Sequence, residues 1–268
     1  SEPCHAGMRS TGMTDACDLI VVGAGFAGLT CAQAAAVRGA RTLVIERKSD
    51  VGANCHTTGI LVKEVADAWD VPGELTRRIH GVRLYGPSLR WIDLCSPGYF
   101  FLATETPGLM RHLADLAEGA GAEIRLATSY AGCQRTNGGF RIATRGAECS
   151  EFVGRFLAVA DGARSRVAAD LRLGANRRFL VGTEVELAGV RGLDEDRLHV
   201  FLDNRLAKGY IAWAVPGVGV TQVGLATTGP IAGRLDLLLE RLASVCDLSQ
   251  AKIVARRGGL IPCGGPVR

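Results

Sequence analysis

The chain has 268 residues and a net charge of +4, with 47% apolar and 22% charged residues. These are the proportions of a globular protein of one or two domains. The basic residues are scattered rather than gathered in runs, so we predict no nucleic-acid partner. No stretch approaches 18 uninterrupted apolar residues, so we predict no transmembrane segment.

The nine cysteines are odd in number and form no Cys-x-x-Cys pair. We therefore predict neither a disulfide framework nor a metal site, and expect reduced thiols in a cytoplasmic protein. The first 14 residues are polar and lack the apolar core of a signal peptide. We leave them out of the fold prediction and expect Met13 to be the natural start.

The strongest pattern lies between Asp18 and Glu46. The apolar run from Leu19 to Val22 has the length and β-branched content of a buried strand. A glycine turn follows, then a small-residue helix from Leu29 to Val37 and a second apolar run from Thr42 to Ile45. This order predicts a strand, turn, helix and strand in one compact unit.

Three glycines in Gly-x-Gly-x-x-Gly spacing give this turn its chemistry. Gly23 allows the tight turn, Gly25 lets a pyrophosphate approach the backbone, and Gly28 lets the helix pack closely on the sheet. The helix N-terminus attracts the phosphates, and Glu46, about 20 residues further on, can accept hydrogen bonds from the adenosine ribose. The pattern predicts a dinucleotide site; the alternative is a glycine-rich turn in another kind of α/β protein.

Two later loops also carry polar groups directly after predicted strands. The loop from Val51 to Gly59 contains Cys55 and His56, which are either reactive groups or ordinary loop residues. The buried run that ends at Ala160 is followed by Asp161 and a glycine. Asp161 either places a carboxylate near a polar ligand or caps the next helix.

The remaining pattern alternates between α/β and β-rich pieces. We predict helices at residues 60–69, 75–79, 107–119 and about 235–245. We predict antiparallel strands within residues 81–101 and 179–228, a strand at 123–128, a hairpin at Asn137-Gly138-Gly139 and turns from residue 258 onward. The predicted architecture interleaves a nucleotide-binding domain (residues 15–75 and 105–175) with β-rich segments (residues 76–104 and 176–268).

Four motifs together resemble one family. They are the glycine fingerprint ending in Glu46-Arg47, the Ala160-Asp161-Gly162-Ala163-x-Ser165-x-Val167 motif, the segment Gly209 to Pro216, and the piece Gly258 to Pro262. The first two resemble FAD-dependent oxidoreductases with the p-hydroxybenzoate hydroxylase fold, and the last two resemble the geranylgeranyl reductases within that group. The resemblance implies a Rossmann-like FAD-binding domain interleaved with an antiparallel β-sheet substrate domain.

The family's functional residues carry over to matching positions of this chain. The resemblance implies that the glycine turn holds the FAD pyrophosphate, that Glu46 holds the ribose and that Arg47 lies over the adenine. It implies that Asp161 and Gly162 approach the pyrophosphate and the ribityl chain. The turn residues concerned are Gly23, Ala24, Gly25, Ala27 and Gly28.

The resemblance also suggests where the substrate binds. Cys55 would lie beside the isoalloxazine, and Cys55 and His56 are the candidate catalytic residues. Tyr210, Trp213 and Pro216 would line the cavity of an apolar substrate. The family continues past this region into a second Gly-Asp motif that holds the flavin, so we expect this chain to lack the C-terminal part.

The implied activity is hydride transfer from NAD(P)H, bound transiently, through FAD to a carbon–carbon double bond of an isoprenoid-like substrate. One alternative is a flavin-dependent aromatic monooxygenase. Another is an inactive fragment that at most binds nucleotide. The oligomeric state, the particular substrate and a peripheral contact with a membrane are left open by the sequence.

Overall fold

The computed structural model describes residues 16–146 and 150–265, so the polar segment containing Met13 lies outside the described residues. The chain forms two compact units, which are described separately. Unit 1 comprises Ser1–Ser49 and Leu116–Asp161, and unit 2 comprises Asp50–Asp115 and Gly162–Arg268. The domain boundaries predicted from the sequence stay a prediction.

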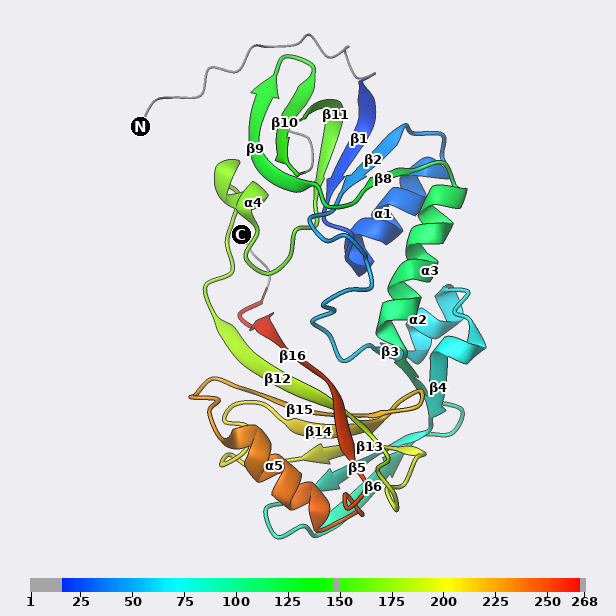
Figure 1. Cartoon of the computed structure of the whole chain (residues 1–268), viewed down its shortest axis with the longest axis vertical. Helices are drawn as coiled ribbons and strands as arrows, with labels where there is room; N and C mark the ends of the chain where they lie inside the picture. The colour runs from blue at the N-terminus through cyan, green and yellow to red at the C-terminus, as the bar shows by residue number, and fades with distance from the viewer. Residues whose placement is uncertain (1–15, 147–149, 266–268) are drawn as a thin grey trace. The chain divides into compact units, whose positions relative to one another are not determined.

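Unit 1 is built on a six-stranded sheet in the order β8-β2-β1-β11-β10-β9 (Figure 1). The first four strands run parallel, whereas β10 and β9 continue the sheet as an antiparallel meander. The strands are β1 (Cys17–Val22), β2 (Thr42–Ile45), β8 (Glu123–Arg125), β9 (Ser129–Thr136), β10 (Gly139–Arg145) and β11 (Glu151–Val159). The predicted strand at Thr42–Ile45 and the hairpin at Asn137-Gly138-Gly139 are confirmed.

Helix α1 (Phe26–Ala36) packs on this parallel sheet. Strands β1 and β2 present fully buried side chains such as Ile20 and Leu43, and the helix buries Leu29 against them. A parallel strand that is buried on both faces has a continuous run of apolar residues. The apolar run at residues 19–22 is therefore typical of such a strand. The helix begins three residues before the predicted start, because Phe26, Ala27 and Gly28 of the glycine turn are already helical.

Unit 2 contains a seven-stranded sheet and a three-stranded sheet. The larger has the order β16-β12-β15-β14-β13-β5-β6 and is antiparallel except for the parallel pair β5 and β13. Its strands are β5 (Gly81–Tyr85), β6 (Trp91–Cys95), β12 (Phe179–Ala188), β13 (Arg197–Phe201), β14 (Ala212–Pro216), β15 (Thr221–Thr227) and β16 (Lys252–Pro262). The smaller sheet has the order β3-β7-β4, with β3 (Ile60–Val62), β4 (Thr76–Ile79) and β7 (Phe101–Thr104).

Helix α5 (Arg234–Ala243) covers one face of the seven-stranded sheet (Figure 1). Leu238 and Leu242 of the helix are fully buried in one cluster with Val185, Val223 and Leu225 of the strands. Because side chains alternate along a strand, Glu184 and Trp213 lie on the other face. The helix therefore leaves that second face for a different use.

The shorter helices are α2 (Lys63–Ala68), the 3-10 helix η1 (Gly73–Leu75) and α4 (Arg166–Asp170). Helix α3 (Thr106–Gly119) agrees with the predicted helix at 107–119. Among the described residues, no helix is long and apolar enough to cross a membrane.

Three local predictions are wrong, each because strand pairing overrides helical spacing or turn chemistry. Residues 60–62 pair with β7, so the predicted helix at 60–69 shrinks to α2. Residues 76–79 form β4 on the other side of β7 rather than a helix. Residues 258–262 continue strand β16, where Gly258 and Gly259 let the strand lie against β12 instead of making a turn.

Alanine substitution of Gly28 tests the close packing of α1. A helical Gly→Ala change normally stabilises by about 0.5–1 kcal/mol. Here a Cβ would overlap the carbonyl oxygen of Gly23, so we expect Gly28→Ala to lower the free energy of unfolding by about 1–3 kcal/mol. Gly119→Ala, at the end of α3 with nothing within 4 Å of the new methyl group, is the matched control. Urea unfolding should show a lower free energy of unfolding for Gly28→Ala and a higher one for Gly119→Ala. Equal changes in the two variants would contradict the close packing of α1 at Gly28.

Candidate functional site

The turn between β1 and α1 is the first candidate site, and two of its glycines are fixed by sterics. Gly23 has φ of 103°, in the region that favours glycine, and a Cβ there would overlap the carbonyl oxygen of Ala160. At Gly28 a Cβ would overlap the carbonyl oxygen of Gly23. The β1–α1 turn, the start of the helix and the end of β11 therefore meet backbone to backbone.

Gly25 is different, because its surroundings are open. It is the N-cap of α1 with φ of −84°, an ordinary conformation, and nothing lies within 4 Å of a Cβ built there. Among the described residues, no side chain caps α1, and its first turn contains no acidic residue. A helix N-terminus of this kind, with open space in front of it, fits a pyrophosphate.

Glu46 ties the end of β2 to this turn. Its buried carboxylate accepts a hydrogen bond from the N–H of Ala24 at 2.8 Å and another from the N–H of Lys48 at 2.9 Å. The sequence prediction gave Glu46 a ribose-binding role only, whereas the structure shows that it also shapes the glycine turn. Each carboxylate oxygen has a second lone pair, so ribose hydroxyls can still donate to it.

The other predicted cofactor residues lie at strand ends. Arg47 follows β2 and is exposed. Asp161 follows β11, and Gly162 has φ of 94° with open space around its Cα. The alternative role of Asp161 as a helix cap is wrong, because Ser165 caps α4 by accepting a hydrogen bond from the N–H of Ala168 at 2.8 Å.

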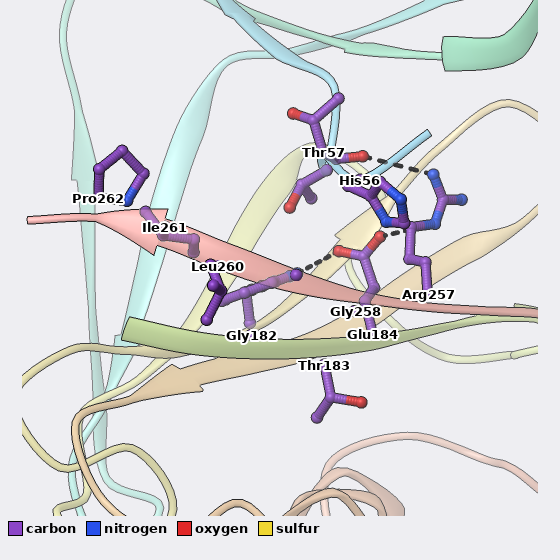
Figure 2. Close-up of a pocket in the computed structure, with 13 residues that line it drawn as sticks. His56, Thr57, Gly182, Thr183, Glu184, Arg257, Gly258, Leu260, Ile261 and Pro262 are labelled. Atoms are coloured by element: carbon purple, nitrogen blue, oxygen red, sulfur yellow. Dashed lines mark hydrogen bonds and ion pairs between the residues drawn. The ribbon is translucent and has the colours of Figure 1, made fainter. Parts of the chain in front are cut away.

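Unit 2 contains the second candidate site, a cavity of about 330 Å³ on the sheet face opposite α5 (Figure 2). Its wall combines four apolar side chains with six polar or charged ones and three glycines. The lining residues are His56, Thr57, Thr58, Gly182, Thr183, Glu184, Trp213, Arg257, Gly258, Gly259, Leu260, Ile261 and Pro262. In the described part of the chain, no group of three or more histidine, cysteine, aspartate or glutamate side chains is placed to hold a metal ion.

A buried carboxyl group organises the polar part of this cavity. Glu184 accepts a hydrogen bond from the indole Nε1–H of Trp213 at 2.7 Å and lies 3.3 Å from Nε of Arg257. Burial raises the pKa of Glu184, although Trp213, Arg257 and Thr58 act in the opposite direction. Arg257 also forms an ion pair with Glu186.

The sequence prediction missed Glu184. The available signal was a pair of acidic residues at 184 and 186 within a mostly apolar strand. Two residues apart, they lie on one face of β12, and a basic partner on a neighbouring strand could be anticipated. The pairing of Glu184 with Arg257 across β12 and β16 supplies that partner.

The predicted substrate residues do not share one cavity. Trp213 lines the cavity described above, Pro216 lines a separate hollow on unit 2 next to Leu187 and Thr221, and Tyr210 is 47% exposed. Their assignment to substrate binding stays a prediction. His56 lines the cavity of Trp213, while the thiol of the preceding Cys55 donates to the carbonyl oxygen of Gly52 at 3.3 Å.

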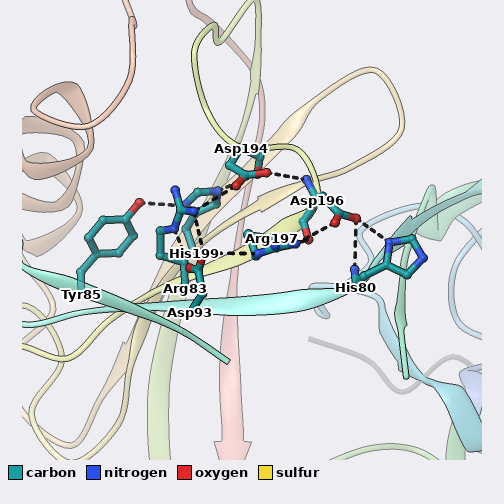
Figure 3. Close-up of polar contacts among 8 residues, drawn as sticks. All are labelled: His80, Arg83, Tyr85, Asp93, Asp194, Asp196, Arg197 and His199. Atoms are coloured by element: carbon teal, nitrogen blue, oxygen red, sulfur yellow. Dashed lines mark hydrogen bonds and ion pairs between the residues drawn. The ribbon is translucent and has the colours of Figure 1, made fainter. Parts of the chain in front are cut away.

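A second polar network lies on the α5 side of the same sheet (Figure 3). His199 is 1% exposed; its Nε2–H donates to the carbonyl oxygen of Asp194 at 2.8 Å, so its Nδ1 accepts from the hydroxyl of Tyr85 at 3.0 Å. Arg83 binds Asp93 through two hydrogen bonds of 2.7 and 2.8 Å. All these groups satisfy one another, so we interpret the network as structural.

The fold and the glycine turn define the class of this chain. It has the mixed α/β fold of FAD-dependent oxidoreductases, with a Rossmann-like FAD-binding domain and antiparallel sheets. Residues 21–83 match the NAD(P)-binding Rossmann-like domain family.

Two named relatives resemble this chain over most of its length. Digeranylgeranylglycerophospholipid reductase 1 of Methanothermobacter thermautotrophicus is 29% identical over 267 residues, covering 92% of this chain and 66% of the relative. The solved geranylgeranyl bacteriochlorophyll reductase-like protein of Thermoplasma acidophilum has a TM-score of 0.83 at 24% identity, covering 92% of this chain and 66% of that one. The resemblance to the geranylgeranyl reductases is thereby confirmed.

More distant structures share the fold alone. Aklavinone-11 hydroxylase in a ternary complex with FAD and aklavinone has a TM-score of 0.71 at 18% identity, covering 93% of this chain and 54% of the hydroxylase. The chain spans 66% of the length of the first curated relative and 55% of another.

The buried His199 predicts a pH dependence of stability. Burial lowers the pKa of His199 in the folded chain. When the pH falls below about 6.5, the ordinary pKa of histidine, the imidazole therefore binds a proton more readily in the unfolded chain than in the folded one. The free energy of unfolding should therefore fall as pH drops below about 6.5, by at most about 1.4 kcal/mol per pH unit from this group.

His199→Gln should flatten this dependence between pH 6.5 and 5, as measured by urea unfolding at a series of pH values. An unchanged slope in His199→Gln would show that other groups cause the pH dependence.

Proposed function

We propose that the chain forms the cofactor- and substrate-binding part of an FAD-dependent reductase that saturates a carbon–carbon double bond of an isoprenoid lipid. The observation that carries this proposal is the open, uncapped N-terminus of α1 at Gly25. The substrate class is supported by the relative named digeranylgeranylglycerophospholipid reductase.

The residues of unit 1 fit FAD. The turn from Gly23 to Gly28 would hold the pyrophosphate, Glu46 the ribose and Arg47 the adenine, with Asp161, the last residue of unit 1, toward the ribityl chain. Bound FAD would supply hydride chemistry, with NAD(P)H as the transient donor. The protein's own task is to bind the cofactor in one orientation through a backbone that needs little rearrangement, as the steric constraints at Gly23 and Gly28 indicate.

The cavity of unit 2 fits an apolar chain. Trp213, Leu260, Ile261 and Pro262 supply apolar surface beside the polar groups of the wall. A lipid substrate would also bring a cytoplasmic protein into peripheral contact with a membrane surface. His56 and the neighbouring Cys55 remain candidate catalytic residues at this cavity.

An aromatic monooxygenase is the second candidate function, because aklavinone-11 hydroxylase has the same fold. The two functions differ in how the flavin is reduced and where its electrons go. Anaerobic reduction by NAD(P)H without an aromatic effector, followed by saturation of an isoprenoid alkene, would support the reductase. Reduction that requires an aromatic effector would favour the monooxygenase, and a protein that acquires no flavin absorbance with added FAD would fit the inactive fragment.

Valine at position 25 tests the cofactor site without disturbing the fold. Its side chain would fill the open space in front of α1, so we expect Gly25→Val to weaken FAD binding at least about tenfold, or about 1.4 kcal/mol. The protein without FAD should lose only about 1 kcal/mol of stability, because valine is disfavoured at the N-cap, while position 25 has an ordinary φ and no neighbour within 4 Å.

Gly132→Val, in strand β9 and equally free of neighbours, is the matched control. FAD titration followed by flavin fluorescence compares the two variants with the original chain. Equal affinities in all three would refute the placement of the pyrophosphate at α1.

A further inference from the structure

Saturating a double bond requires a proton as well as a hydride, and the following inference about that proton rests on the proposed function. The sequence offers Cys55, His56 and Tyr210 as proton donors. Tyr210 is 47% exposed and does not line the cavity, whereas His56 lines it but is itself exposed. Cys55 is only half-buried and is not among the residues that line the cavity. None of the three is therefore a buried group on the cavity wall, where an apolar substrate would be protonated away from water.

Glu184 has the surroundings that these residues lack. Its side chain is only 5% exposed and lines the cavity, where it lies beside Arg257 of β16 (Figure 2). It also accepts the hydrogen bond from Trp213 of β14. The carboxyl group is thus part of the cavity wall and is held by contacts from two other strands of unit 2.

The charges around Glu184 are unbalanced. Arg257 faces two carboxyl groups, and its closer ion pair is with Glu186, while its Nε lies 3.3 Å from Glu184. If both carboxyl groups were ionised, one buried negative charge would have no cation of its own, which is costly in a desolvated site. Glu186 is 18% exposed and Glu184 5%, so the proton belongs on Glu184.

We propose that Glu184 is the proton donor for the double bond. The O–H bond of the Glu184 carboxyl group breaks, and a C–H bond forms at the carbon next to the one that receives the hydride. Bound reduced FAD would supply that hydride, so the alkene would gain two electrons and two hydrogens in total. The resulting Glu184 carboxylate is stabilised by the Trp213 indole N–H and by Arg257, and it regains its proton from water.

Burial supports this assignment independently, because it raises the pKa of Glu184. The group therefore keeps its proton to a higher pH than an exposed glutamic acid, whose pKa is about 4.3. General acids are commonly adjusted in this way, and a positioned acid contributes about 10²- to 10⁴-fold to the rate.

The first test needs no turnover. The indole N–H of Trp213 donates directly to Glu184, so its NMR signal reports the protonation of this carboxyl group. The signal is assigned with Trp213→Phe and followed against pH in the full chain. We expect a midpoint above about 4.3, no such titration in Glu184→Gln, and a lower midpoint in Glu186→Gln, where Arg257 is left to Glu184 alone.

The second test uses the FAD-loaded protein with geranylgeraniol as the probe. Glu184→Gln should slow saturation of the probe at least about 100-fold, while the rate of flavin reduction stays unchanged. Glu195→Gln, at an exposed residue that pairs with Arg77, is the control and should match the original chain in both tests.

A Trp213 midpoint at or below about 4.3, or full-rate alkene saturation by Glu184→Gln, would overturn the proposal. Loss of the proposed function itself looks different. In that case the original chain would bind no FAD, or would reduce its flavin without saturating the probe, and the Trp213 titration would still decide whether Glu184 holds a proton.

Discussion

The close approach of backbone to backbone at the β1–α1 turn is the constraint on which the rest of unit 1 depends. Gly28 lies directly against the carbonyl of Gly23, and Gly23 lies against that of Ala160, so no side chain larger than hydrogen fits at either position. This packing fixes where α1 begins. The Glu46 carboxylate stabilises the turn by accepting a hydrogen bond from the Ala24 N–H. Gly25 alone is left open, and that opening is what makes the helix end suitable for phosphates.

In unit 2 the two faces of the seven-stranded sheet have different roles. The face toward α5 buries a continuous apolar cluster that includes Val185, Leu225 and Leu238. The opposite face presents Glu184 and Trp213, one residue out of phase with that core. A single strand, β12, therefore contributes both to the stability of the unit and to its cavity.

The sequence predicted well those features whose cause is local. The glycine turn, strand Thr42–Ile45 and the hairpin at Asn137-Gly138-Gly139 each follow from residues adjacent in the chain. Strand β4 and the final segment of β16 were missed because their structure comes from pairing with distant strands. Glu184 was missed for the same reason: its character as a buried acid depends on Arg257, which only the register of β12 and β16 brings opposite it.

Mapping FAD onto the backbone amides by NMR tests the central claim most directly. The account predicts saturable shifts centred on the amides of residues 25–28 at the N-terminus of α1, with smaller changes at Glu46 and Arg47. Shifts that leave the 25–28 amides unchanged while FAD binds elsewhere on the chain would contradict it.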